Sequence, residues 1–158
     1  MADREEVWDP PAWAWPVTTI LALVGLGLSI YLTIVHYSTA VTLACSSTGT
    51  INCEKVTTSA QSYLLGRPVA VWGLVYFVVV LVMCLPAAWR SQSQAMKIGR
   101  VALSILGVLF VLRLIYAELF EIDAICLWCT AVHAVMLALF GAVLVATAAA
   151  TNPPQAAE

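Results

Sequence analysis

Four long apolar stretches alternate with short polar segments along the chain, at residues 17–36, 69–88, 101–120 and 125–146. Each approaches the roughly 20 residues that a helix needs to cross the hydrocarbon core of a bilayer. This pattern predicts an all-α integral membrane protein, built as a four-transmembrane-helix bundle. Little of the 158-residue chain remains for any other domain.

The composition supports the membrane class and excludes other classes. Hydrophobic residues make up 62% of the chain and charged residues 10%, whereas soluble domains are about half apolar and a quarter charged. The net charge is only -2 and the seven basic residues are scattered, so neither a nucleic-acid-binding surface nor a polybasic lipid-binding patch is expected.

The charges between the stretches predict the orientation in the membrane. The loop between the second and third stretches carries Arg90, Lys97 and Arg100. The connection between the third and fourth carries Glu118, Glu121 and Asp123 and no basic residue. Because basic loops stay in the cytoplasm, the first of these loops should be cytoplasmic, together with both termini.

Three segments follow from this orientation. Residues 1–16 form a cytoplasmic N-terminal tail, residues 17–148 the membrane domain, and residues 149–158 a cytoplasmic C-terminal tail. The first stretch is not a cleavable signal peptide, because acidic residues outnumber Arg4 ahead of it and its apolar run is too long.

The first outer loop contains a second pattern, in which Val56, Ala60, Tyr63 and Leu64 recur at helical spacing. This spacing predicts a short amphipathic helix that ends near Gly66 and lies over the outer mouth of the bundle.

Four of the five cysteines fall on the outer side in this topology: Cys45, Cys53, Cys126 and Cys129. Cys84 falls near the inner end of the second stretch, too far away to pair with them, and is interpreted as an apolar filler.

The sequence Cys-Leu-Trp-Cys at 126–129 opens the last helix, with Asp123 as the expected N-cap. Two cysteines at this spacing lie on one face of a helix and can close a small disulfide. The unpaired backbone N–H groups of a helix start stabilise a thiolate. We therefore expect Cys126 to react with other disulfides and Cys129, one turn deeper, to face the interior of the bundle.

Other interpretations of the four cysteines remain. A zinc site is disfavoured, because seven residues separate Cys45 from Cys53 where zinc sites typically have two to four, and no metal is expected. Structural disulfides in a non-enzymatic tetraspanning scaffold are a stronger alternative, although a disulfide within one helical turn constrains little. A redox relay between a loop pair and a fixed pair accounts best for the pattern.

The cysteine pattern, taken with Asn52, Ser59, Tyr63, the Gly-Arg-Pro sequence at 66–68 and Gly73, resembles the vitamin K epoxide reductase family, in particular its bacterial members. The disulfide-bond formation protein B family places its two cysteine pairs in the reverse order. The resemblance implies a thiol:quinone oxidoreductase that supports disulfide-bond formation. It assigns Cys126 and Cys129 as the active-site pair and Cys45 and Cys53 as the shuttle pair.

The resemblance also implies a location and partners. It implies a multi-pass protein of the bacterial cytoplasmic membrane, with menaquinone or ubiquinone as electron acceptor. A separate thioredoxin-fold protein of the DsbA type would be the thiol partner. An asparagine and a tyrosine of the vertebrate pocket correspond to Val69 or Ala70 and to His133, which favours plain quinone reduction over epoxide reduction.

Several side chains are candidates for the quinone pocket. His133 follows Cys129 by four residues on the same helical face and could hydrogen-bond a quinone oxygen, or it could be satisfied by a neighbouring backbone group. The aromatic candidates are Trp72, Tyr76, Tyr116 and Trp128. Aromatic residues in membrane helices more often serve packing or interface anchoring, and Trp128 is favoured by its place inside the motif.

Overall fold

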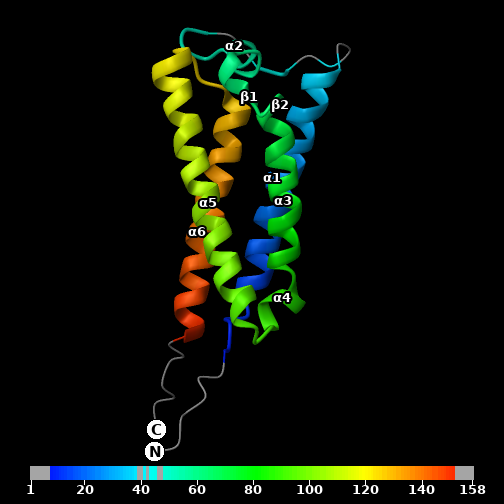
Figure 1. The fold of residues 1–158 in the computed structure, drawn as a ribbon, viewed down its shortest axis with the longest axis vertical. Helices are drawn as coiled ribbons and strands as arrows, with labels where there is room; N and C mark the ends of the chain where they lie inside the picture. The colour runs from blue at the N-terminus through cyan, green and yellow to red at the C-terminus, as the bar shows by residue number, and fades with distance from the viewer. Residues whose placement is uncertain (1–7, 39–40, 42, 46–47, 152–158) are drawn as a thin grey trace, which may run out of the picture.

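Four long helices lie side by side along the molecular axis in the computed structural model, which describes residues 8–38, 41, 43–45 and 48–151 (Figure 1). They are α1 (Ala14–Tyr37), α3 (Val69–Cys84), α5 (Gln94–Tyr116) and α6 (Leu127–Thr151). α1 packs against α3 and α6, and α6 also packs against α5. The predicted helical architecture is confirmed. Residues 1–7 of the predicted N-terminal tail and most of the predicted C-terminal tail lie outside the described residues.

Within the described ranges, three helical segments are long and apolar enough to cross a membrane: α1, residues 94–122 and α6. The chain is therefore a membrane protein. α3 is apolar but has 16 residues, which rise about 24 Å against a hydrocarbon core of about 30 Å.

The helix α3 ends before the predicted boundary at residue 88. Leu85 is extended, with φ -62° and ψ 154°, because the ring of the following Pro86 disfavours the helical conformation in the residue before it. A separate short helix, α4 (Pro86–Arg90), then begins with the proline in its first turn, where the missing N–H is not needed.

Small side chains bring α1 and α3 close together. The residues of α1 that are buried recur every three or four positions: Ala14, Thr18, Ala22, Gly25, Ser29 and Leu32. Membrane helices associate through such small residues. At Gly25, a Cβ atom would collide with the buried ring of Phe77 on α3, so this contact requires glycine.

A set of buried polar contacts joins the helices at the end of the bundle that carries α4. The indole N–H of Trp89 donates to the Thr18 hydroxyl at 3.0 Å, and that of Trp8 donates to the Trp89 carbonyl at 2.9 Å. The Arg100 guanidinium lies 3.5 Å from the centroid of the Trp89 ring. These contacts tie α1, α4 and α5 to the segment before α1.

The first outer loop lies at the opposite end of the bundle and contains α2 (Cys53–Thr57), the 3-10 helix η1 (Ala60–Ser62) and the strands β1 (Tyr63–Leu64) and β2 (Arg67–Pro68) (Figure 1). The prediction of a single amphipathic helix is wrong here. Ser59 is extended, with ψ 159°, and interrupts the helix.

A hairpin replaces the second half of that predicted helix. Leu65 and Gly66 have φ of 53° and 74°, and two positive φ values in a row are what a tight two-residue hairpin turn requires. The turn pairs Tyr63 with Pro68 and Leu64 with Arg67.

The connection from α5 to α6 also differs from the prediction. The π-helix η2 (Ala117–Ile122) continues α5 beyond the expected end. Asp123 takes the left-handed conformation, with φ 52°, and ends η2 instead of capping α6 as expected. Aspartate tolerates this conformation because its short polar side chain can hydrogen-bond locally.

Candidate active site

Cys126 occupies the N-cap position of α6. Its carbonyl accepts the first helical hydrogen bond, from the Thr130 N–H at 2.8 Å. Its sulfur accepts a hydrogen bond from the Cys129 backbone N–H at 3.3 Å, as the side chain of a capping residue does. The Cys126 sulfur is therefore held at the positive end of the helix dipole.

The surroundings of Cys126 favour its thiolate form. A hydrogen bond from the Cys129 thiol lowers the pKa of Cys126, and the backbone N–H groups of Cys129 and Trp128 add to this effect, while burial and the nearby Glu118 oppose it. The net direction is below the usual range of a thiol. Cys126 and Cys129 are both free thiols in this structure, and Cys126 is 0% exposed.

A disulfide joins Cys45 to Cys53, with the two Cα atoms 6.1 Å apart. The loop that carries this disulfide is attached to the segment before α6 by two backbone hydrogen bonds. Ile125 donates to the Thr50 carbonyl at 2.9 Å, and Asn52 donates to the Ile125 carbonyl at 3.0 Å. Cys53 and Cys126 belong to the same buried cluster, so the loop pair lies against the helix-start pair.

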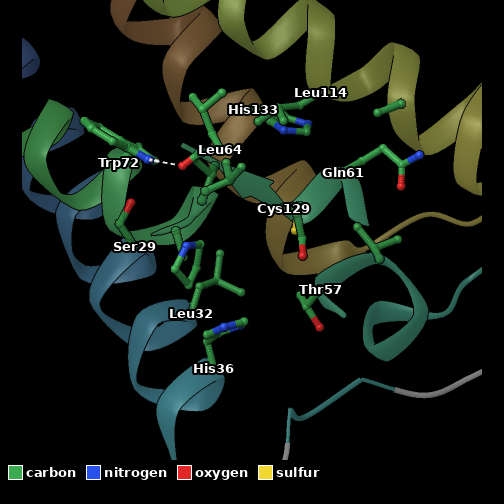
Figure 2. Close-up of a pocket in the computed structure, with 18 of the residues that line it drawn as sticks. Ser29, Leu32, His36, Thr57, Gln61, Leu64, Trp72, Leu114, Cys129 and His133 are labelled. Carbon is green, nitrogen blue, oxygen red and sulfur yellow. Dashed lines mark hydrogen bonds between the residues drawn. The ribbon is translucent and has the colours of Figure 1, made fainter. Parts of the chain in front are cut away.

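A cavity of about 1080 Å³ opens below this cluster, between the helices and under the outer loop. Figure 2 shows side chains of α1, the loop and α6 around it, among them Cys129 and His133. Its volume is slightly above the range of about 300 to 1,000 Å³ for small-molecule sites, and its lining is mostly apolar. Cys129 lines the cavity, whereas Cys126 lies outside the lining.

The hairpin of β1 and β2 borders the cavity and is held from two sides. The Trp72 indole N–H on α3 donates to the Leu64 carbonyl at 3.0 Å (Figure 2). The Tyr63 hydroxyl and the His36 Nε2 atom of α1 are hydrogen-bonded at 3.2 Å. The hairpin therefore bridges α1 and α3.

The aromatic residues expected at a pocket separate into two groups. Trp72 and Tyr76 line the cavity, and so does His133. Tyr116 lies outside the lining, exposed and stacked on Phe120 with ring centroids 5.1 Å apart. Trp128 also lies outside it.

Trp128 instead fastens the loop to the bundle. Its indole N–H donates to the Ala44 carbonyl at 3.0 Å, and its ring lies 4.6 Å from that of Tyr31 on α1. The tryptophan inside the motif therefore holds the residue that precedes Cys45.

Sequence reasoning did not single out Glu118, which it placed in the acidic connection between the third and fourth stretches. The side chain is buried, with 6% of the residue exposed, and lines the cavity. A signal was present: the buried residues of α5 include Ser104 and Val111, and Glu118 follows at the same seven-residue interval. The stripe of α5 that faces the bundle therefore continues into η2.

In the described part of the chain, no three His, Cys, Asp or Glu side chains are grouped to hold a metal ion.

The family model of the vitamin K epoxide reductase family matches residues 16–144, which is most of the chain. No curated protein sequence matches the chain. Members of this family are oxidoreductases that act on thiols and disulfides with quinones. The chain therefore belongs to the vitamin K epoxide reductase family and is a membrane thiol-disulfide oxidoreductase.

Proposed function

We propose that the protein oxidises a thioredoxin-fold partner of the DsbA type and passes the electrons through Cys45 and Cys53, then Cys126 and Cys129, to a membrane quinone. One arrangement carries this proposal. The loop disulfide lies against Cys126, while Cys129, one helical turn away, lines a large apolar cavity. Cys45 and Cys53 line this cavity as well, so the loop disulfide, the helix-start pair and the space for a lipid-soluble acceptor would lie next to one another.

The cycle conserves electrons and protons. The partner dithiol reduces the Cys45–Cys53 disulfide and leaves as a disulfide. A loop thiolate then attacks the oxidised Cys126–Cys129 pair at Cys126 and frees Cys129, and the second loop cysteine resolves the mixed disulfide. The reduced pair gives two electrons to the quinone, which becomes a hydroquinone with two protons, and the Cys126–Cys129 disulfide forms again.

Burial favours Cys53 as the loop cysteine that exchanges with Cys126. Cys53 is 2% exposed and belongs to the buried cluster that contains Cys126. Cys45 is only partly buried and packs against the edge of this cluster. Cys45 is therefore the better site of attack for a soluble partner.

The quinone pocket is proposed to be the cavity beside Cys129. Trp72, Tyr76 and His133 belong to its lining and are retained as quinone contacts. Tyr116 and Trp128 are not retained. Either menaquinone or ubiquinone fits this chemistry, because the cavity needs to accept only a quinone ring.

We further propose that α3 spans the membrane with the three longer segments, in a bacterial cytoplasmic membrane. The helix α2, which begins with Cys53, lies at the end of the bundle opposite to α4 (Figure 1). Cys45 is bonded to Cys53, and Cys126 belongs to the same buried cluster. Because the basic residues Arg90 and Lys97 are at the α4 end, that end is assigned to the cytoplasm and the cysteine pairs to the outside.

Purified protein mixed with a reduced thioredoxin-like partner and a short-chain quinone tests the proposal by the loss of quinone absorbance. We expect wild type and a Cys84→Ser control to consume quinone, and Cys129→Ser to show only the background rate. A partner with a single cysteine should form a trapped mixed disulfide with Cys45. Equal quinone consumption by wild type and Cys129→Ser would contradict the proposal.

A further inference from the structure

Glu118 is a buried acid beside both reactive sulfurs. It is the second residue of η2, it is buried, and the backbone N–H of Cys126 lies near its carboxyl group. Its charge also interacts with the sulfurs of Cys126 and Cys129. Glu118 and Cys129 both line the cavity, so the carboxyl group borders the space proposed for the quinone.

Neutralisation by a basic side chain does not account for this burial. In the described residues of this region, Arg113 forms an ion pair with Glu121, at 2.8 Å, and not with Glu118. Lys55 donates to the Asp123 carbonyl at 3.3 Å. Burying an unpaired carboxylate is costly, and ionisable groups inside membrane segments commonly belong to proton or ion pathways.

Glu118 lies in the first turn of the π-helix η2. Single turns of π-helix are rare, and many of those that occur lie at functional sites. Here Ala117, Glu118 and Ile122 of η2 are buried, while Leu119 and Phe120 are exposed. Glu118 thus continues the buried stripe of α5 into η2, where the other buried residues, Ala117 and Ile122, are apolar.

We propose that Glu118 is the proton-transfer residue of quinone reduction, an inference that rests on the proposed function. In the reduced pair, Cys129 keeps its thiol proton and donates a hydrogen bond to the Cys126 thiolate. Glu118 holds the proton that left Cys126. Two neighbouring negative charges in an apolar site repel each other strongly, so one proton on the carboxyl group relieves the repulsion.

The step balances. The two sulfurs give two electrons to the quinone and form the Cys126–Cys129 disulfide. The quinone oxygens receive one proton from Cys129 and one from the Glu118 carboxyl group, which yields hydroquinone and a Glu118 carboxylate. The next loop dithiol brings two protons, of which one restores the Cys129 thiol and the other the Glu118 carboxyl group.

The test is a single turnover of pre-reduced protein with a short-chain quinone, without oxygen. Glu118→Gln keeps the size of the side chain and an acceptor for the Cys126 N–H but cannot transfer the proton. Its quinone reduction should slow by about 100-fold or more, which is typical of a lost general acid. The rate at which the partner reduces the loop disulfide should stay unchanged. Glu118→Asp should give an intermediate rate, and Glu121→Gln, one turn away and exposed, the wild-type rate.

The pH profile adds a readout that a structural role would not change. The wild-type rate should fall as the pH rises and Glu118 loses its proton, and this fall should be absent from the residual rate of Glu118→Gln. The other titratable groups around Glu118 are Cys126, Cys129 and His133 on α6, with Glu54 and Lys55 exposed on α2. All are retained in both proteins.

Infrared difference spectra of the wild type keep the proposal testable if Glu118→Gln does not fold. Oxidation of the helix-start pair should remove a protonated carboxyl band, because Glu118 gives up its proton. A wild-type difference spectrum without this band, or a folded Glu118→Gln with the wild-type rate and pH profile, would overturn the inference. A wild type that does not reduce quinone would instead refute the proposed function.

Discussion

The side chain of Asn52 caps α2, the short helix that begins with the loop cysteine Cys53. Its Oδ1 atom accepts a hydrogen bond from the Lys55 backbone N–H at 2.9 Å. Asn52→Ala removes this acceptor and leaves the first turn of α2 uncapped. Its backbone bond to Ile125 is retained, because the alanine still carries the N–H. The variant therefore tests how firmly the cap holds Cys53 against Cys126.

The size of the effect follows from the single lost hydrogen bond. Replacing an asparagine N-cap by alanine costs about 1 kcal/mol. If this free energy is used to hold Cys53 in place, the equilibrium ratio of molecules with Cys53 beside Cys126 to molecules with Cys53 displaced falls about fivefold. The effective concentration of the Cys53 thiol at Cys126 should fall by the same factor.

A disulfide equilibrium measures this quantity directly. Replacing Cys45 and Cys129 by alanine leaves Cys53 and Cys126 as the pair at this end, because Cys84 is fully buried in α3 at the other end. The protein is equilibrated with glutathione buffers of known ratio, and the Cys53–Cys126 disulfide is quantified after alkylation of free thiols.

Asn52→Ser is the matched control, because serine caps helices about as well as asparagine. We expect the serine variant to keep the parental effective concentration and the alanine variant to lose about fivefold. An unchanged value for Asn52→Ala, or an equal loss for both variants, would refute the reasoning that the cap positions Cys53.

Three further outcomes are expected. Gly25→Ala should destabilise the bundle by about 1 to 3 kcal/mol, because the new Cβ meets a buried ring of α3. Gly27→Ala should not destabilise the bundle, because there is open space around Gly27. Denaturant titration in detergent measures the difference. Cys129→Ala should raise the pKa of Cys126 by removing its strongest hydrogen bond, so thiolate absorbance should appear at higher pH than in wild type; an unchanged titration would contradict this cause. Trp72→Phe should loosen the hairpin over the cavity, and faster hydrogen exchange in β1 and β2, without a change in α6, would show it.

The helices were predictable because membrane-spanning segments need long apolar runs, which are visible in the residues themselves. The errors occurred where a single residue changes the backbone. Pro86 ends α3 early, and the turn at Leu65 and Gly66 makes a hairpin from residues with helical spacing. Spacing alone could not separate these outcomes, because a few apolar positions in a short loop fit a helix or a hairpin equally well.

At the site, the family resemblance implied the pairing of Cys45 with Cys53, which a disulfide joins, but no pattern indicated what surrounds the sulfurs. Cys129 was expected to face the interior, and it lines the cavity. Tyr116 stacks on Phe120 of η2, and Trp128 is held by the Ala44 carbonyl in the loop, and no local sequence pattern encodes these contacts. Glu118 was not singled out because an acid near a turn is ordinarily solvated.

The complete burial of Cys126 determines which molecules can react with it. Glutathione and other small thiols in the surrounding water reach Cys126 only after the loop has moved aside, so they compete poorly with the tethered loop cysteine. Hydrophobic oxidants dissolved in lipid meet Cys129 instead, from the cavity. The two sulfurs of one four-residue motif are thus accessible to different molecules, because Cys126 is fully buried and Cys129 borders the cavity.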